Sequence, residues 1–219
     1  MSTGIDVDKV CCHRVVLHEL DFHGQPYSLS ILKVGYCLPQ PDGTFRADCT
    51  ISLITGPRTI LVDTGGPWDR DYLQVKLKEK DLEPANVSYV VGTHGHSDHV
   101  GNLNLFPSAT TVVGYDVSRG DRYLPNKMAE GQAYSIDEYK KLTLTDIDPG
   151  QRDVSVEVRG LSGGTALCAG DLFERCDDED SWQELSMDTA LQEVHRQKAL
   201  QSADIIIPGH GWPFRVLRS

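Results

Sequence analysis

The sequence has no apolar run approaching the roughly 20 residues that a helix needs to cross a bilayer. Its first ten residues, MSTGIDVDKV, lack the apolar stretch behind a basic start that marks a secretory signal. The six cysteines form no C-x-x-C pair, which argues against a disulfide scaffold. We therefore expect a chain that does not enter the membrane and works in a reducing compartment, the cytosol or the nucleus.

Basic residues are in the minority, because Lys and Arg number 21 against 32 Asp and Glu, and the formal net charge is −11. An acidic protein repels polyanions at long range, so binding to nucleic acid would need a local basic patch or bound cations. No linker or low-complexity tract interrupts the 219 residues, and 39% of them are hydrophobic. That is enough for one sizeable core, so we expect a single domain over residues 1–219.

Short segments rich in Val, Ile and Leu alternate with turns that contain Gly and Pro, which is typical of strands. They predict strands at 14–20, 27–34, 49–55, 58–62, 87–91, 110–113, 141–147, 154–158, 165–169 and 205–207. Gln40-Pro41-Asp42-Gly43 predicts a turn, and 125–135 predicts a loop. Helices are expected at 68–80, where Leu73 and Leu77 share one face, and at 189–201. This pattern favours an α/β protein built as a four-layer αββα sandwich.

Three imidazoles and one carboxylate fall within six residues, directly after the apolar segment 87–91. The stretch reads His94-Gly95-His96-Ser97-Asp98-His99. Imidazole nitrogen and carboxylate oxygen are preferred donors to Zn²⁺. His94 and His96 alternate along an extended segment and can share one side, whereas Asp98 and His99 follow the turn and can face a second metal. A polar loop with accidental histidines would rarely show this spacing, so the sequence predicts a zinc site.

Three further candidates stand at the ends of predicted strands, each within two residues of a glycine, which lets the backbone turn sharply. Asp63 lies in VDTGG, Asp171 in AGD and His210 in PGHG. Each segment is common on its own. Together with the histidine cluster they predict that donors from separate parts of the chain meet in one pocket. The brief acidic run at 177–180 is interpreted as a solvated loop.

In this order along the chain, VDTGG, HGHSDH, AGD and PGHG resemble the metallo-β-lactamase superfamily. Longer stretches, among them VVGTHGHSDHVGNLNLFP and PGHGWPFRVLR, resemble one of its subgroups. The resemblance implies the metallo-β-lactamase fold and a zinc-dependent hydrolase with two metal ions.

The resemblance also implies a role for each candidate residue. His94 and His96 would bind the first zinc, and Asp171 would bridge the two ions. The implied ligands of the second zinc are Asp98, His99 and His210. Asp98 or Asp171 would also act in catalysis by steadying the attacking hydroxide. Asp63 would orient a ligand histidine without touching the metal.

One histidine of the family pattern is missing. The family carries a further ligand of the first zinc in a T-P-G-H segment between the histidine cluster and the bridging aspartate, but this chain reads TDIDPGQRD at 145–153. No histidine occurs between His99 and His195. We therefore expect a depleted first site and a nearly intact second site. Gln151 or Asp148 is a candidate substitute, although an amide is a poor zinc ligand.

The subgroup resemblance implies an endoribonuclease that cleaves RNA phosphodiesters in 3′-end processing of histone pre-mRNA and forms a homodimer. Arg119, Arg122 and Lys127, near Tyr123, could contact phosphates, although a solvated loop is the default interpretation. Two alternatives stay open. The short chain suits a thioester hydrolase of the glyoxalase II type, and the missing histidine suits a catalytically impaired zinc-binding scaffold protein.

Overall fold

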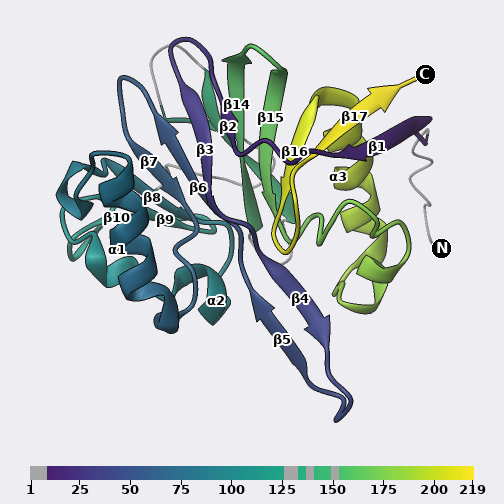
Figure 1. The fold of residues 1–219 in the computed structure, drawn as a ribbon, viewed down its shortest axis with the longest axis horizontal. Coiled ribbons are helices and arrows are strands. Elements are labelled where there is room, and N and C mark those ends of the chain that lie inside the picture. The colour runs from purple at the N-terminus through teal and green to yellow at the C-terminus, as the bar shows by residue number, and fades with distance from the viewer. Residues whose placement is uncertain (1–8, 126–132, 137–140, 149–152) are drawn as a thin grey trace.

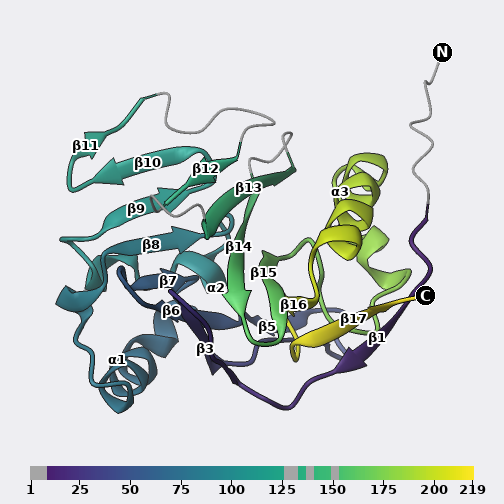
Figure 2. The same cartoon turned by 90° about the horizontal axis from the view of Figure 1, so that it is seen from above.

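Two sheets packed face to face form the centre of the molecule in the computed structural model, which describes residues 9–125, 133–136, 141–148 and 153–219 (Figures 1 and 2). In those residues one sheet has eight strands, in the order β11 (Arg122–Tyr123), β10 (Asp116–Arg119), β9 (Thr110–Val113), β8 (Tyr89–Gly92), β7 (Ile60–Val62), β6 (Ile51–Thr55), β3 (Ser28–Lys33) and β2 (Asp21–Phe22). The other has seven, in the order β1 (Cys12–Val16), β17 (Phe214–Arg218), β16 (Ile205–Pro208), β15 (Gly164–Gly170), β14 (Asp153–Leu161), β13 (Leu142–Asp148) and β12 (Tyr134–Ser135).

One helix covers the outer face of each sheet, as Figure 2 shows for α1 (Arg70–Glu79) and α3 (Thr189–Ser202). The buried apolar residues form three clusters that match these layers. The largest lies between the sheets, and the other two lie beneath α1 and beneath α3. The four-layer αββα sandwich is therefore confirmed. Among the described residues no helix is long and apolar enough to cross a membrane.

The helix expected at 68–80 begins with a short 3₁₀ turn, η1 (Pro67–Asp69), and continues as α1. Pro67 suits the start because its missing N–H would have no partner there. Leu73 and Leu77, four residues apart, are fully buried against the eight-stranded sheet, and burial of each contributes about 1.5–3 kcal/mol. Further 3₁₀ turns are η2 (Pro84–Asn86), η3 (Leu103–Leu105) and η4 (Ser181–Glu184).

A two-stranded ribbon projects from the body and was not expected from the sequence. It consists of β4 (Tyr36–Pro39) and β5 (Phe45–Asp48), paired antiparallel around the predicted turn at 40–43 (Figure 1). Only the turn was predicted. The strands were not predicted because Leu38 and Phe45 are exposed, so the ribbon lacks the pattern of a strand with one buried face.

Two other expectations differ from the structure. Residues Tyr134–Ser135 form the short strand β12, where a loop was expected across 125–135, and residues 126–132 lie outside the described part. The strand expected at 14–20 ends at Val16.

Candidate metal centre

The candidate ligands lie where parallel strands end. β7 pairs with β8 in one sheet, and β15 pairs with β16 in the other, both in parallel. Asp63 directly follows β7, and Asp171 directly follows β15. His94 and His210 each come two residues after the end of β8 and β16. Because parallel strands run in one direction, their carboxyl ends meet at one edge, where α/β proteins commonly bind ligands.

The histidine cluster changes conformation halfway along. His96 is extended and occupies the N-terminal position just before the short helix α2 (Ser97–Val100), which contains Asp98 and His99. The turn therefore separates His94 and His96 from Asp98 and His99, as the spacing predicted. His99 is fully buried, whereas His96 is exposed and contacts His94 through Nδ1 and Nε2, 2.8 Å apart.

Asp171 lies between the two groups of histidines. Its Oδ2 is 3.3 Å from His94 Nε2, and its Oδ1 is 3.3 Å from both His99 Nε2 and His210 Nε2. Asp98 Oδ2 is 3.9 Å from the same two nitrogens of His99 and His210. Zinc bonds of about 2.0–2.1 Å at a tetrahedral angle place two ligand atoms roughly 3.3 Å apart. The donors are therefore spaced as ligands of shared ions.

Two buried atoms at the centre have no hydrogen-bond partner among the described residues, namely His99 Nε2 and Asp171 Oδ1. They are 3.3 Å apart, yet no hydrogen bond joins them. A buried polar atom without a partner costs about 1–3 kcal/mol. A zinc ion bound by both atoms would remove that cost, so the donor set fits the metal that the sequence predicts.

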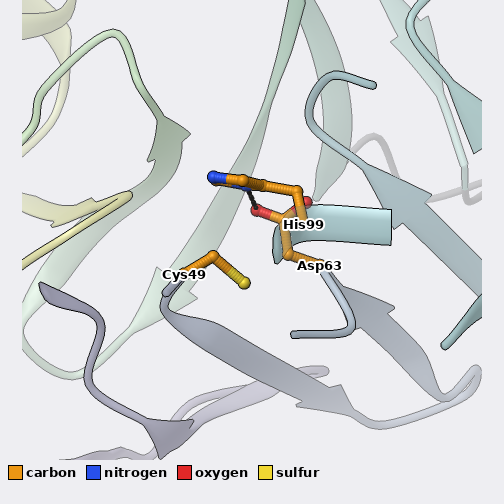
Figure 3. Close-up of side chains that lie close together, drawn as sticks. All are labelled: Cys49, Asp63 and His99. Atoms are coloured by element: carbon orange, nitrogen blue, oxygen red, sulfur yellow. Dashed lines mark hydrogen bonds and ion pairs between the residues drawn. The ribbon is translucent and has the colours of Figure 1, made fainter. Parts of the chain in front are cut away.

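Asp63 fixes the orientation of His99. Its carboxylate accepts a hydrogen bond from His99 Nδ1 at 2.9 Å (Figure 3). It accepts a second from the backbone N–H of Thr93 at 2.8 Å. With Nδ1 donating, the neutral ring presents Nε2 to the centre as an acceptor. Asp63 has a φ of 60°, a strained conformation for a residue other than glycine that functional sites often retain. The geometry agrees with an orienting role for Asp63.

Cys49 also lies close to Asp63 and His99 (Figure 3), and one donor atom from each lies within 4.8 Å of the others. This group does not suit a metal, because the His99–Asp63 hydrogen bond already occupies two of the donors. Burial raises the pKa of the Cys49 thiol well above its usual value, and only a thiolate is a good ligand. Cys49 instead belongs to the apolar cluster that contains Leu73 and Leu77.

We expect Asp63→Asn to weaken zinc binding by about 10–100-fold, the usual cost of losing a partner that orients a ligand. The amide lacks the negative charge that holds the ring of His99. Competition with a chromophoric chelator measures the change. Asp21→Asn is a suitable control because Asp21 pairs with Lys80 at the surface, where both side chains are partly exposed, and it should leave zinc affinity unaltered.

His210 is oriented by the backbone. Its Nδ1 donates to the carbonyl of Asp48 at 3.0 Å, which leaves Nε2 facing Asp171. The Asp48 carboxylate in turn contacts Lys33 Nζ at 2.5 Å and accepts from Trp68 Nε1 at 2.7 Å. The base of the β4–β5 ribbon is thereby tied to the metal centre.

Close packing at Gly209 leaves no room for a side chain. A β-carbon there would overlap the Asp171 carboxylate and would lie 3.1 Å from the carbonyl carbon of Gly170. The glycine of PGHG is therefore required for the approach of its segment to Asp171.

Nearby carboxylates favour positive charge on two histidines of the centre, His99 and His210. Burial opposes protonation of His210, but the nearby Asp171 carboxylate outweighs it and raises the pKa of His210 to about 9. The pKa of His99 is raised in the same way by Asp171 and Asp63, against the effect of burial. Burial lowers the pKa of His94 to about 4. Zinc would replace the protons of His99 and His210, since ligand imidazoles must be deprotonated.

The donors open onto a cleft of roughly 270 Å³. Besides His94, His96, Asp98, Asp171 and His210, its walls are Cys37, Phe45, Ala47, Asp153, Leu172, Glu174, Trp182, Leu185 and Gln192. None of the nine was predicted. Glu174 and Trp182 lie in the segments AGDLFE and DEDSWQ, which resemble the family's subgroup beyond the ligands. The cleft residues of the β4–β5 ribbon gave no recognisable signal.

All six predicted ligands and Asp63 come together, and their grouping matches the implied assignment for the second zinc but only in part for the first. The ligand atoms of His94, His99 and Asp171 form one set, and those of Asp98, His99 and His210 form another. His99 belongs to both sets, and His96 lies at the exposed margin beside His94. Gln151 and the side chain of Asp148 lie outside what the structure describes, so a substitute for the missing histidine stays a prediction.

The two-sheet sandwich and the histidine–aspartate cluster at its edge define a class, and the comparisons agree with it. The family model of the metallo-beta-lactamase superfamily matches residues 46–210. The chain therefore belongs to the metallo-β-lactamase superfamily, whose members are generally metal-dependent hydrolases.

Among its relatives is the human metallo-beta-lactamase domain-containing protein 1, which is 45% identical over 89% of this chain and 84% of the human protein. A solved metallo-beta-lactamase structure from Thermotoga maritima matches with a TM-score of 0.66 at 19% identity, covering 88% of this chain and all of that one. An N-acyl homoserine lactone hydrolase matches with a TM-score of 0.58 at 17% identity, covering 83% and 92%.

Proposed function

We propose that this chain is a zinc-dependent hydrolase that cleaves RNA phosphodiesters, as the sequence resemblance implies for histone pre-mRNA. The observation that carries hydrolysis is the position of Asp171, whose two oxygens face His94 on one side and His99 and His210 on the other. Paired zinc ions would supply Lewis-acid activation of water and of the scissile group. Asp171 and Asp98 would hold and orient that water.

The charge of the cleft supports a phosphodiester only when metal is present. Its lining contains four carboxylates, Asp98, Asp153, Asp171 and Glu174, and among the described lining residues no Lys or Arg. Two Zn²⁺ ions carry four positive charges and would balance them. Phe45 lines the cleft and is 58% exposed. Unpaired RNA bases commonly stack on such rings.

Hydrolysis of a thioester or lactone is the second candidate. The described lining contributes no Lys or Arg and several apolar side chains, among them Ala47, Leu172 and Leu185, which suits a neutral acyl substrate. The structurally similar N-acyl homoserine lactone hydrolase favours the same class of chemistry.

The deciding experiment compares zinc-loaded and chelator-treated protein on fluorescent single-stranded RNA, a glutathione thioester and an acyl homoserine lactone. We expect zinc-dependent cleavage of RNA. In Phe45→Ala, loss of base stacking worth about 1–3 kcal/mol should raise KM by roughly 5–150-fold. Turnover of the thioester or lactone alone would favour the second candidate. No turnover at full zinc loading would favour the scaffold role.

A further inference from the structure

A buried group of charges lies behind the metal centre, where the sequence predicted a solvated loop at 177–180. Asp178 is 0% exposed and Arg196 is 2% exposed. Neither lines the cleft. Of the other members of the run, Asp177, Glu179 and Asp180 are exposed as expected.

The Asp178 carboxylate accepts four hydrogen bonds from three separate segments. Arg196, on α3, donates to both of its oxygens, at 2.7 and 3.0 Å, and Arg14, on β1, donates at 2.8 Å. The fourth comes from the backbone N–H of Glu174, at 2.8 Å. The guanidinium of Arg196 also stacks over the rings of Phe173 and Trp182, 4.2 and 4.7 Å from their centroids. Both charges are therefore satisfied, and their geometry is fixed.

This group holds the segment that carries Asp171. Arg196 Nη1 donates to the carbonyl of Leu172 at 2.7 Å, one residue beyond Asp171. Asp178 holds the N–H of Glu174, and the carbonyl of Glu174 accepts from the N–H of His210 at 3.0 Å. Arg196 and Asp178 thus hold the backbone of Leu172 and Glu174. Leu172 follows Asp171 in the chain and Glu174 bonds the backbone of His210, so the pair acts on both candidate ligands without touching either.

A buried ion pair is a poor source of stability in itself, because desolvation offsets most of the attraction, and an apolar replacement is often no worse. The buried charges of Asp178 and Arg196 are better explained by their directional hydrogen bonds, which fix one conformation of the segments they join. We propose that Asp178, held by Arg196 and Arg14, is a positioning residue that sets Asp171 and His210 at zinc-binding separation. The inference rests on the proposed metal centre.

The test measures zinc affinity by chelator competition at a temperature where circular dichroism shows every variant folded. Asp178→Asn should weaken zinc binding by about 10–100-fold, as removal of a ligand's supporting partner does. Arg196→Lys keeps the charge but loses the planar fork and the bond to Leu172, so it should weaken binding in the same direction. It serves as the second variant should Asp178→Asn fail to fold.

Leu77→Ala is the control for a general loss of stability. Leu77 is a fully buried residue of α1, in a cluster that shares no residue with the one around Phe173. Its truncation therefore destabilises the fold without touching the Asp178 group. Zinc affinity of the folded Leu77→Ala protein should match that of the wild type. Normal zinc binding by both Asp178→Asn and Arg196→Lys, or equal weakening in Leu77→Ala, would overturn this inference but not the proposed metal centre. A wild-type chain that binds no zinc would overturn the metal centre as well.

Discussion

Asp171→Ala is expected to lower kcat/KM by more than about 10³-fold, equivalent to at least ~4 kcal/mol of lost transition-state stabilisation. Asp171 is the one candidate ligand whose two oxygens face both groups of histidines, each at 3.3 Å. Its removal deprives both positions of a donor and leaves His99 and His210 without the carboxylate that balances their charge. Steady-state kinetics on whichever substrate the wild type turns over measures the loss.

The matched control is Asp177→Ala, six residues along the same segment. The Asp177 side chain is 83% exposed and pairs with Arg175. Such an exposed pair is worth about 0–1 kcal/mol, so its removal should change kcat/KM by less than about fivefold. Activity in Asp171→Ala within tenfold of the wild type would contradict a bridging role. The hydrolytic centre would then have to lie elsewhere.

The clustering of the candidate ligands was predictable because its signal is local in the chain. His94, His96, Asp98 and His99 lie within one six-residue motif, and the remaining candidates each follow a short apolar strand. Since parallel strands bring such ends to one edge, the pocket follows from the strand pattern. The orientation of His99 by Asp63 also followed, because carboxylates commonly hold ligand histidines.

The charge group behind the centre was not predictable in this way. Asp178 belongs to a run of four acids, and such runs are usually solvated. Its burial depends on Arg14 and Arg196, which are 164 and 18 residues away. Nothing in the run itself marks one carboxylate as different from its neighbours. Tertiary pairing between segments decided its burial.

The two strands of the β4–β5 ribbon were not predicted, for a different reason. Strand prediction relies on alternating buried and exposed side chains, but this ribbon stands away from the sheets, and Phe45 and Leu38 are exposed. Phe45, Ala47 and Cys37 instead line the cleft. Residues that contact a ligand need not follow the alternating pattern of core residues, so the sequence did not predict this wall of the cleft.

The chain is expected to retain about one zinc ion after dialysis against a weak chelator, although the family resemblance implies two. Asp98, His99, His210 and Asp171 offer four donors, which can close a tetrahedral zinc site, whereas His94 and His96 share only Asp171 and lack the family histidine. His99 and His210 are buried, and His96 is exposed. The number of donors and their burial both favour the second zinc position. Elemental analysis of the dialysed protein measures the ratio of zinc to protein.

Two single variants separate the positions. His210→Ala should lose the retained zinc, because it removes a buried donor whose Nδ1 is already held by the carbonyl of Asp48. His96→Ala should keep that zinc and lose only the weakly held ion that appears when zinc is in excess. Two ions retained by the dialysed wild type, or loss of the tight ion in His96→Ala, would contradict this order. The first position would then have a further ligand, for which Gln151 and Asp148 are the candidates that the sequence offers.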